Sequence, residues 1–161
     1  MYGLVVLLHV LGAFLFVLAH GASMLVSFRL RSERDPVRQA ALFDLSSTGI
    51  IVMYVGLMIL LLAGIAAGFM GGHWGRGWIW ASLGTLVLVM AVMYLVATPF
   101  YGRMRAAAGA AVPEQVVARM QPPPAPEDLE SLATSNRPIL LATVGGIGLA
   151  FITWLMLAKP F

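Results

Sequence analysis

Four long apolar stretches separated by polar segments dominate the pattern of this chain. They cover roughly residues 2–28, 45–70, 78–101 and 138–158, and none of them contains Asp, Glu, Lys or Arg. A helix of about 20 apolar residues crosses the hydrocarbon core of a bilayer. The pattern therefore predicts an all-α polytopic membrane protein, a four-transmembrane-helix bundle that forms one domain over residues 1–161.

Composition supports a membrane environment and excludes several kinds of chemistry. Only 11% of the 161 residues are charged, against about 25% in soluble domains. The chain has no cysteine, which excludes disulfides, thiolate metal sites and a cysteine nucleophile. No carboxylate pair or nucleophile–base set occurs at a workable spacing, which excludes a hydrolase of soluble substrates and favours, without deciding it, a protein that is not an enzyme.

The basic residues predict an orientation in the membrane. Eight arginines lie in two of the connecting segments, 29–44 and 102–137, whereas Arg76 and Lys159 lie on the opposite side. By the positive-inside rule these two segments are cytoplasmic and both termini are outside. The clustering beside apolar stretches also argues against nucleic acid as a partner. We expect a bacterial inner membrane, with residues 1–22 retained as a span because no basic start marks a signal peptide.

The connection 102–137 is rich in proline. "PEQVVARM" predicts a short surface helix that begins at its proline. "QPPPAPEDLE" predicts extended chain. "SLATSN" offers Ser and Thr as helix caps before the fourth span.

The two halves of the chain share a weak pattern. The first span ends "SFRLRS" and the third ends "FYGRMRA", whereas "LSSTG" opens the second span and "LATSN" precedes the fourth. This pattern is typical of two parallel-repeated hairpins. A chance match of arginine-rich helix ends stays an equal alternative.

Small and polar residues of the first span share one face. At 100° per residue, this stripe comprises His9, Gly12, Ala13, Phe16, His20, Ser23 and Ser27. Small residues allow close approach of membrane helices, and polar side chains join them. We therefore expect His9 and His20, about 16 Å apart along the axis, to face the bundle interior rather than lipid.

Counting residues from the arginine-rich end places Met53, Gly145 and Gly146 at nearly the depth of His20, about 13 Å in. One hypothesis is a hydrogen-bonded buried imidazole without further function. The other is an axial ligand to haem b, with His or Met as the second ligand and a glycine notch for the macrocycle. The candidate cofactor-binding set is thus His20, His9, Met53, Gly145 and Gly146, with His20 and His9 as metal ligands. For His9, an imidazole at the outer interface is the alternative.

The stretch "LLHVLGAFLF" at residues 7–16 resembles the start of an uncharacterised bacterial family of small four-helix integral membrane proteins. It is more distantly similar to copper-resistance D-type membrane domains and to membrane protoporphyrinogen-oxidase-like haem proteins. The last resemblance implies that His9 is the haem ligand. Those haem proteins also use an intramembrane lysine, whereas the lysine of this chain is Lys159, after the fourth apolar stretch. The resemblance therefore does not carry over their catalysis.

Three hypotheses of function follow. The first is a non-catalytic membrane subunit that packs against larger partners, for example in an electron-transfer complex, or against further copies of itself. The second is a haem b redox protein that uses His20 or His9. The third is a small transporter, which the absence of charged residues from the spans disfavours.

Overall fold

The structure, a computed structural model, describes residues 1–112, 114–118, 120, 122 and 125–161. These residues form helices and turns, without a strand. The spanning segments are α1 (Tyr2–Ser32), α2 (Pro36–Met70), the continuous series α3 (Gly77–Val92), η2 (Met93–Ala97) and α4 (Thr98–Ala107), and α7 (Arg137–Ala158). The short elements are η1 (His73–Gly75), α5 (Glu114–Val117) and α6 (Asp128–Thr134).

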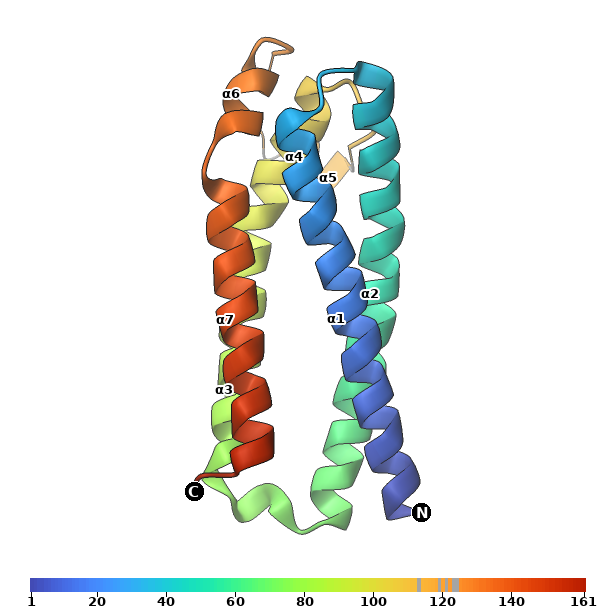
Figure 1. The fold of residues 1–161 in the computed structure, drawn as a ribbon, viewed down its shortest axis with the longest axis vertical. Coiled ribbons are helices and arrows are strands. Elements are labelled where there is room, and N and C mark those ends of the chain that lie inside the picture. The colour runs from blue at the N-terminus through green and yellow to red at the C-terminus, as the bar shows by residue number, and fades with distance from the viewer. Residues whose placement is uncertain (113, 119, 121, 123–124) are drawn as a thin grey trace.

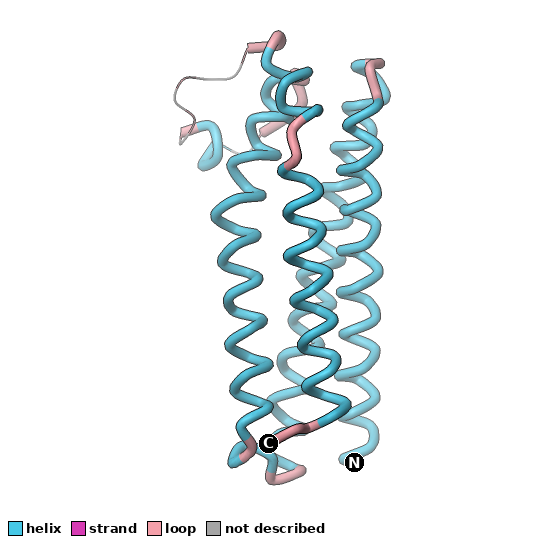
Figure 2. The backbone as a smooth tube through the Cα atoms, turned by 60° about the vertical axis from the view of Figure 1, so that its left-hand side comes forward, coloured by secondary structure: helices cyan, strands magenta, loops and turns pink. Residues whose placement is uncertain are grey.

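The four-helix membrane bundle that the sequence predicts is confirmed. Within the described residues, four helical segments are long and apolar enough to cross a membrane. They run nearly parallel to one axis, with both termini at one end and the arginine-rich turn at the other (Figures 1 and 2). The 35 residues of α2 extend over about 52 Å, which is longer than a hydrocarbon core of about 30 Å.

The turn between α1 and α2 is specified by its polar residues. Asp35 is the N-cap of α2, and its carboxylate accepts a hydrogen bond from the Val37 N–H at 2.9 Å. Pro36 follows at the start of the helix, where a missing N–H costs nothing. Helix α2 therefore begins at this turn, nine residues before its apolar stretch.

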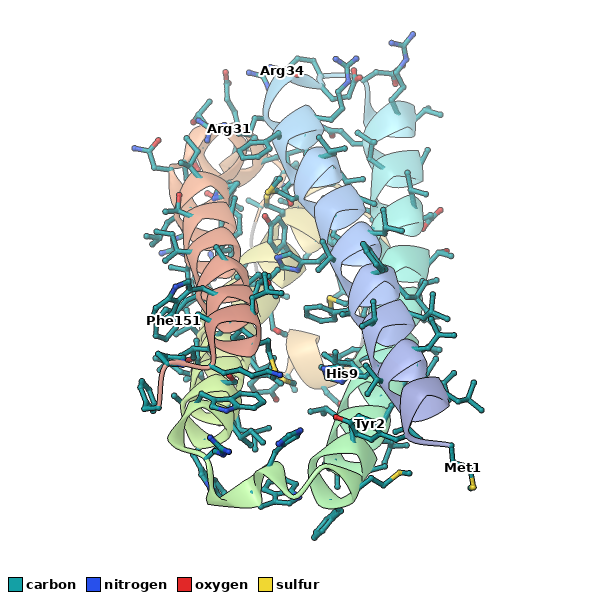
Figure 3. All side chains as sticks on the ribbon, turned by 60° about the horizontal axis from the view of Figure 1, so that its bottom comes forward. Met1, Tyr2, His9, Arg31, Arg34 and Phe151 are labelled. Carbon is teal, nitrogen blue, oxygen red and sulfur yellow. The ribbon has the colours of Figure 1, made fainter. Side chains whose placement is uncertain are left out.

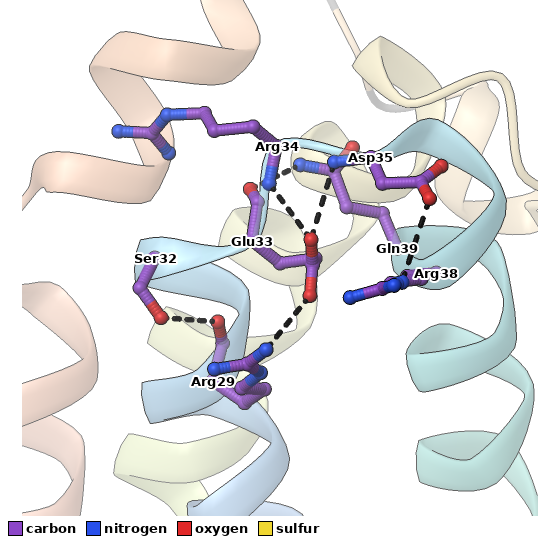
Figure 4. A network of polar contacts seen from close by, with 7 residues as sticks. All are labelled: Arg29, Ser32, Glu33, Arg34, Asp35, Arg38 and Gln39. Carbon is purple, nitrogen blue, oxygen red and sulfur yellow. Dashed lines mark hydrogen bonds and ion pairs between the residues drawn. The ribbon is translucent and has the colours of Figure 1, made fainter.

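Glu33 lies at the centre of this turn (Figure 4). It is 8% exposed. Its carboxylate accepts hydrogen bonds from the backbone N–H groups of Arg34 and Asp35 and from the Arg29 guanidinium, at 3.1–3.3 Å. Its backbone carbonyl accepts from the Gln39 side chain at 2.9 Å. The Asp35 N–H is the main reason that the pKa of Glu33 lies below its ordinary value, against the opposing effect of burial.

Helices α1 and α2 cross with their backbones in contact. A Cβ added to Gly12 would lie 2.5 Å from the backbone nitrogen of Leu60, and one added to Gly56 would lie 2.7 Å from that of Phe16. No side chain fits between the helices at either point. The contact is the close approach that small residues permit in membranes.

Helices α3 and α7 form the second pair, packed through side chains. Trp78, Ile79 and Leu155 make a buried cluster near the chain termini. Farther along, Gly148 of α7 receives the side chain of Val89. Trp78 is 6% exposed, so it belongs to this core rather than to an interfacial anchor.

The larger buried cluster lies at the arginine-rich end. It comprises Val26, Leu30, Phe43, Phe100, Met104 and Ala133, contributed by α1, α2, α4 and α6. Arg105 of α4 crosses to α2, where its guanidinium donates to the Phe43 carbonyl at 3.0 Å and to the Ser47 hydroxyl at 2.8 Å. This end of the molecule therefore joins both helical pairs in one core.

The connection 102–137 differs from the sequence-based expectation. Helix α4 continues to Ala107, and the expected surface helix is the single turn α5. The expectation of Ser and Thr caps in 131–136 is wrong, because Ser131 and Thr134 lie inside α6 and Asn136 caps α7 without a side-chain hydrogen bond. The expected extended chain includes residues 121, 123 and 124, which lie outside the described residues.

The third span contains a π-helical segment, Met93–Ala97, just before Pro99. Proline has no N–H to bond the carbonyl four residues earlier, which here belongs to Leu95. The π segment includes Leu95, and π segments of this kind occur frequently at functional sites. Pro99 is the sequence signal for this irregularity.

Candidate functional site

The polar stripe of α1 faces neighbouring helices, as predicted. Gly12 and Phe16 are buried, and His9 and His20 are partly buried. The opposite face is exposed at Leu11, Phe14, Leu18 and Leu25. The imidazoles therefore lie on the packed side of α1, although they contact different partners.

His9 packs on α2. Its Nδ1 lies 2.8 Å from the Leu60 carbonyl oxygen, and because a carbonyl only accepts, Nδ1 must carry the proton. The ring lies against Gly64, where an added Cβ would be 2.8 Å from Nδ1 and Cε1. Figure 3 shows the side chain directed away from the outer surface of α1. In the neutral ring the lone pair is then on Nε2.

His20 packs on the other helical pair. A Cβ added to Gly145 of α7 would lie 2.8 Å from His20 Nε2 and 3.0 Å from the Met93 methyl carbon. On its own helix, His20 stacks on Phe16 with ring centroids 6.0 Å apart. Imidazole, thioether and glycine thus meet at one point in mid-span.

The predicted layer around His20 is only partly assembled. Gly145 is at the expected place, but the thioether that reaches it is Met93 of η2 rather than Met53 of α2. Gly146 is exposed, and an added Cβ there would meet nothing within 4 Å. Met93 belongs to the irregular part of the third span. Pro99 marks this irregularity in the sequence, but the predicted layer did not include it.

A macrocycle does not fit between His20 and α7 in this arrangement. Nε2 of His20 already lies against the backbone notch of Gly145, which the end of Met93 also reaches, so iron and a porphyrin would require α1 and α7 to separate. His9 is held differently, since a ring whose Nδ1–H is bonded to a carbonyl presents Nε2 in the way that metal-bound histidines do. Within the described part of the chain, no group of three or more His, Cys, Asp or Glu side chains could hold a metal ion.

Two further polar contacts cross between helices. The Tyr101 hydroxyl donates to the Ser27 hydroxyl at 2.8 Å, which in turn donates to the Ser23 carbonyl. At the opposite end, Tyr2 and His73 share a hydrogen bond of 3.3 Å. Ser27 lies on the α1 face that the sequence predicts to be packed, so the sequence contained a signal for the first contact. Nothing in the sequence indicated that the partner of Ser27 is Tyr101.

Comparison with known families assigns the chain. A model of the family described as predicted integral membrane protein (DUF2269) matches residues 3–160, so the chain belongs to this family. The comparisons with curated proteins and with solved structures each found no match. The resemblance to an uncharacterised integral membrane family is thereby confirmed, whereas the similarity to copper-resistance D-type and protoporphyrinogen-oxidase-like proteins finds no support.

Proposed function

For this member of a predicted integral membrane protein family, we propose the role of a non-catalytic membrane subunit. It packs against the helices of a larger membrane partner. The four apolar stretches, residues 2–28, 45–70, 78–101 and 138–158, carry no charged group for proton or ion transfer. The partner is recognised through apolar shape, which the outer faces of the spans provide.

The observation that supports this proposal is the distribution of burial. Side chains in the middle of the spans are widely exposed, for example Leu18 at 70%, Leu95 at 69% and Ile147 at 66%. Among the described residues, the largest fully buried side chains, Phe100, Met104, Leu155 and Ser82, lie toward the ends of the spans. Lipid covers such a surface, and partner helices replace lipid where small residues and grooves give a closer fit.

A groove of this kind, of about 370 Å³, lies on the outer side of the α3–α7 pair. Thr85 and Thr143 lie on its two helices, and Gly148 and Phe151 also line it. Figure 3 shows Phe151 on the outer side of α7. Both threonine hydroxyls bond carbonyls of their own helix, so the groove presents a satisfied apolar surface to a partner helix.

The test is extraction from the native membrane in a mild detergent, followed by sizing with light scattering. We expect a complex much larger than the 17.2 kDa chain. Thr143→Trp should fill the groove and release the chain from the complex. The matched variant Leu18→Trp, at an exposed site on α1, should leave the complex intact. A monodisperse monomer from gently extracted wild-type membranes would reject the proposal.

We also propose that the arginine-rich end faces the cytoplasm of a bacterial cell and that both termini lie outside. The positive-inside rule supports this orientation. The absence of cysteine allows a direct test with single cysteines at Ala111 and at Gly72, at opposite ends of the molecule. An impermeant maleimide applied to intact spheroplasts should label the cysteine at residue 72 and spare that at residue 111. The reverse labelling would overturn the orientation.

A second candidate function is haem b binding at His9. The hydrogen bond from its Nδ1 to the Leu60 carbonyl favours this, because it fixes the ring with Nε2 as the free base. His9 and His20 are too far apart to hold one iron, so a second ligand would come from another helix or from another subunit. A reduced-minus-oxidised spectrum of haem-supplemented protein should show a Soret change that His9→Ala abolishes and His20→Ala retains. A flat spectrum of folded protein would exclude this candidate.

A further inference from the structure

The four spans divide into two bodies. Helices α1 and α2 contact each other backbone to backbone at Gly12 and Gly56. Helices α3 and α7 share the Trp78 cluster and the Gly148–Val89 contact. Figure 1 shows the two pairs side by side, with α1 and α7 diverging toward the termini.

The two bodies are joined most firmly at the arginine-rich end. There the large cluster includes side chains of α1, α2, α4 and α6, and Arg105 bonds α4 to α2. At the end with the termini, the chain segment 71–76 and the Tyr2–His73 hydrogen bond connect them. Between these two ends, in the middle of the spans, the two pairs contact each other in a different way.

In mid-span the pairs meet at His20. Its imidazole crosses from α1 to Gly145 of α7 and lies beside Met93 of η2. The three atoms nearest to a Cβ placed on Gly145 are the ends of side chains, namely Nε2 and Cε1 of His20 and the methyl carbon of Met93. A contact made by side-chain ends separates without any change in the backbone of either pair.

Met93 also opens the irregular part of the third span. The π segment Met93–Ala97 and Pro99 interrupt the regular hydrogen-bond ladder, and kinks in helices concentrate at such places. The third helix is thus most deformable at the point where it receives His20. The backbone on the arginine-rich side of this point is fixed in the large cluster, whereas α3 on the other side belongs to the second pair.

We propose that His20 is a latch between two helical pairs, and that its release lets α3 and α7 move against α1 and α2 about the π segment. The motion separates the pairs on the side of the termini and keeps the arginine-rich core intact. It admits lipid or a partner helix to the inner faces of the pairs. This inference does not depend on the proposed subunit function, since it concerns the motion of the isolated chain.

The experiment measures distances between spin labels in lipid nanodiscs, on a chain that has no native cysteine. Leu11→Cys on α1 and Phe151→Cys on α7 report the distance between the pairs, and both sites are exposed. Leu11→Cys with Ile59→Cys reports the distance within the first pair. In the His20→Ala background we expect the distribution between pairs to broaden and to gain longer distances, while the distribution within the pair stays unchanged.

His9→Ala is the matched control, because His9 contacts α2 of its own pair. It should leave the distance between the pairs as in the wild type. Met93→Ala should reproduce part of the His20→Ala effect. The unchanged distance within the first pair also shows that the variants are folded. The proposal is overturned if His20→Ala leaves the distribution between pairs unaltered, or if it broadens both distributions equally.

Discussion

The two helical pairs solve the same packing problem in different ways. In the α1–α2 pair, glycine removes every side chain from the crossing, so that Gly12 meets the backbone of Leu60 directly. In the α3–α7 pair, Gly148 accommodates the side chain of Val89 instead. A backbone atom cannot move away without bending a helix, whereas a valine side chain can rotate or shift.

This difference indicates which helical pair is rigid and which can adjust. The first pair is rigid, because backbone atoms of the two helices touch at Gly12 and Gly56. The second pair, with its π segment and its side-chain contacts, tolerates adjustment. We therefore expect a substitution to destabilise the protein most where the neighbouring atoms are least able to move.

The largest effect is expected for Gly12→Ala. The added methyl would lie 2.5 Å from the Leu60 nitrogen, and overpacking at a site that cannot yield costs about 3 kcal/mol. The free energy of unfolding in mixed micelles, followed by circular dichroism, measures the loss. Gly3→Ala on the same helix, where nothing lies within 4 Å, is the control. Equal stability of the two variants would contradict backbone contact in the first pair.

A smaller effect is expected for Arg105→Gln, which removes the bond between the pairs at the arginine-rich end. The guanidinium bonds the Phe43 carbonyl and the Ser47 hydroxyl, and hydrogen bonds of charged groups contribute about 2 kcal/mol. The same unfolding assay should show this loss. Arg103→Gln changes a neighbouring arginine whose bond to Pro122 is exposed and should be nearly neutral. A neutral Arg105→Gln would mean that the apolar cluster alone joins the pairs.

Gly148→Ala should destabilise the protein by only about 1 kcal/mol, the lower end for overpacking. Val89 must give way to the new methyl, and as a side chain in the more adaptable pair it can. Gly146→Ala is the matched variant, two residues away with open space around it. It should be neutral or stabilising by about 0.5 kcal/mol from helix propensity. A loss for Gly148→Ala as large as that for Gly12→Ala would remove the distinction between the pairs.

The smallest effect depends on pH and concerns the turn of the first pair. Backbone N–H groups, first that of Asp35, hold the pKa of Glu33 below its ordinary value. The ionised Glu33 side chain therefore contributes fully to the free energy of unfolding when the pH is above that ordinary pKa. This contribution is lost as the pH falls through the lowered pKa of the folded state. Glu33→Gln keeps an acceptor oxygen but lacks the charge, so near neutral pH it should be less stable than the wild type by the contribution of that charge, and the two proteins should converge in acid.

In acid, the unfolding midpoint of the Glu33→Gln protein should fall less steeply with pH than that of the wild type. Asp44→Asn, at an exposed carboxylate, is the control and should keep the wild-type slope. Parallel midpoint curves for Glu33→Gln and the wild type would show that the turn does not depend on this charge.

Much of the fold could be predicted because apolar length and small-residue spacing are local properties. The stripe of α1 placed His9 and His20 on the packed face, since azimuth on a helix follows from residue number alone. Gly56, Leu60 and Gly64 of α2, four residues apart in sequence, contact this face of α1. The expected functional roles of these residues stay predictions.

The composition of the candidate site could be predicted only in part. Gly145 was found by counting residues from the arginine-rich end, which gives the depth of a residue in the span. Met53 was expected where Met93 lies, because the depth of a residue does not tell which helix it faces. Helix α6 was missed because its Ser and Thr residues favour caps and turns in isolation. In the structure, Ala133 anchors this helix in the large cluster, and that tertiary contact outweighs the local preference.

The four spans, the arginine-rich end and the inward face of the first helix follow from the order of residues alone, since each depends on residue type and helical period. The pairing of α1 with α2 through backbone contact, the pairing of α3 with α7 through side chains, and the reach of His20 to Gly145 beside Met93 become visible only in the folded chain. The physical reason is that nearly all surfaces of these helices are apolar. Many pairings then have similar burial, and the choice among them depends on atomic fit between residues distant in the chain.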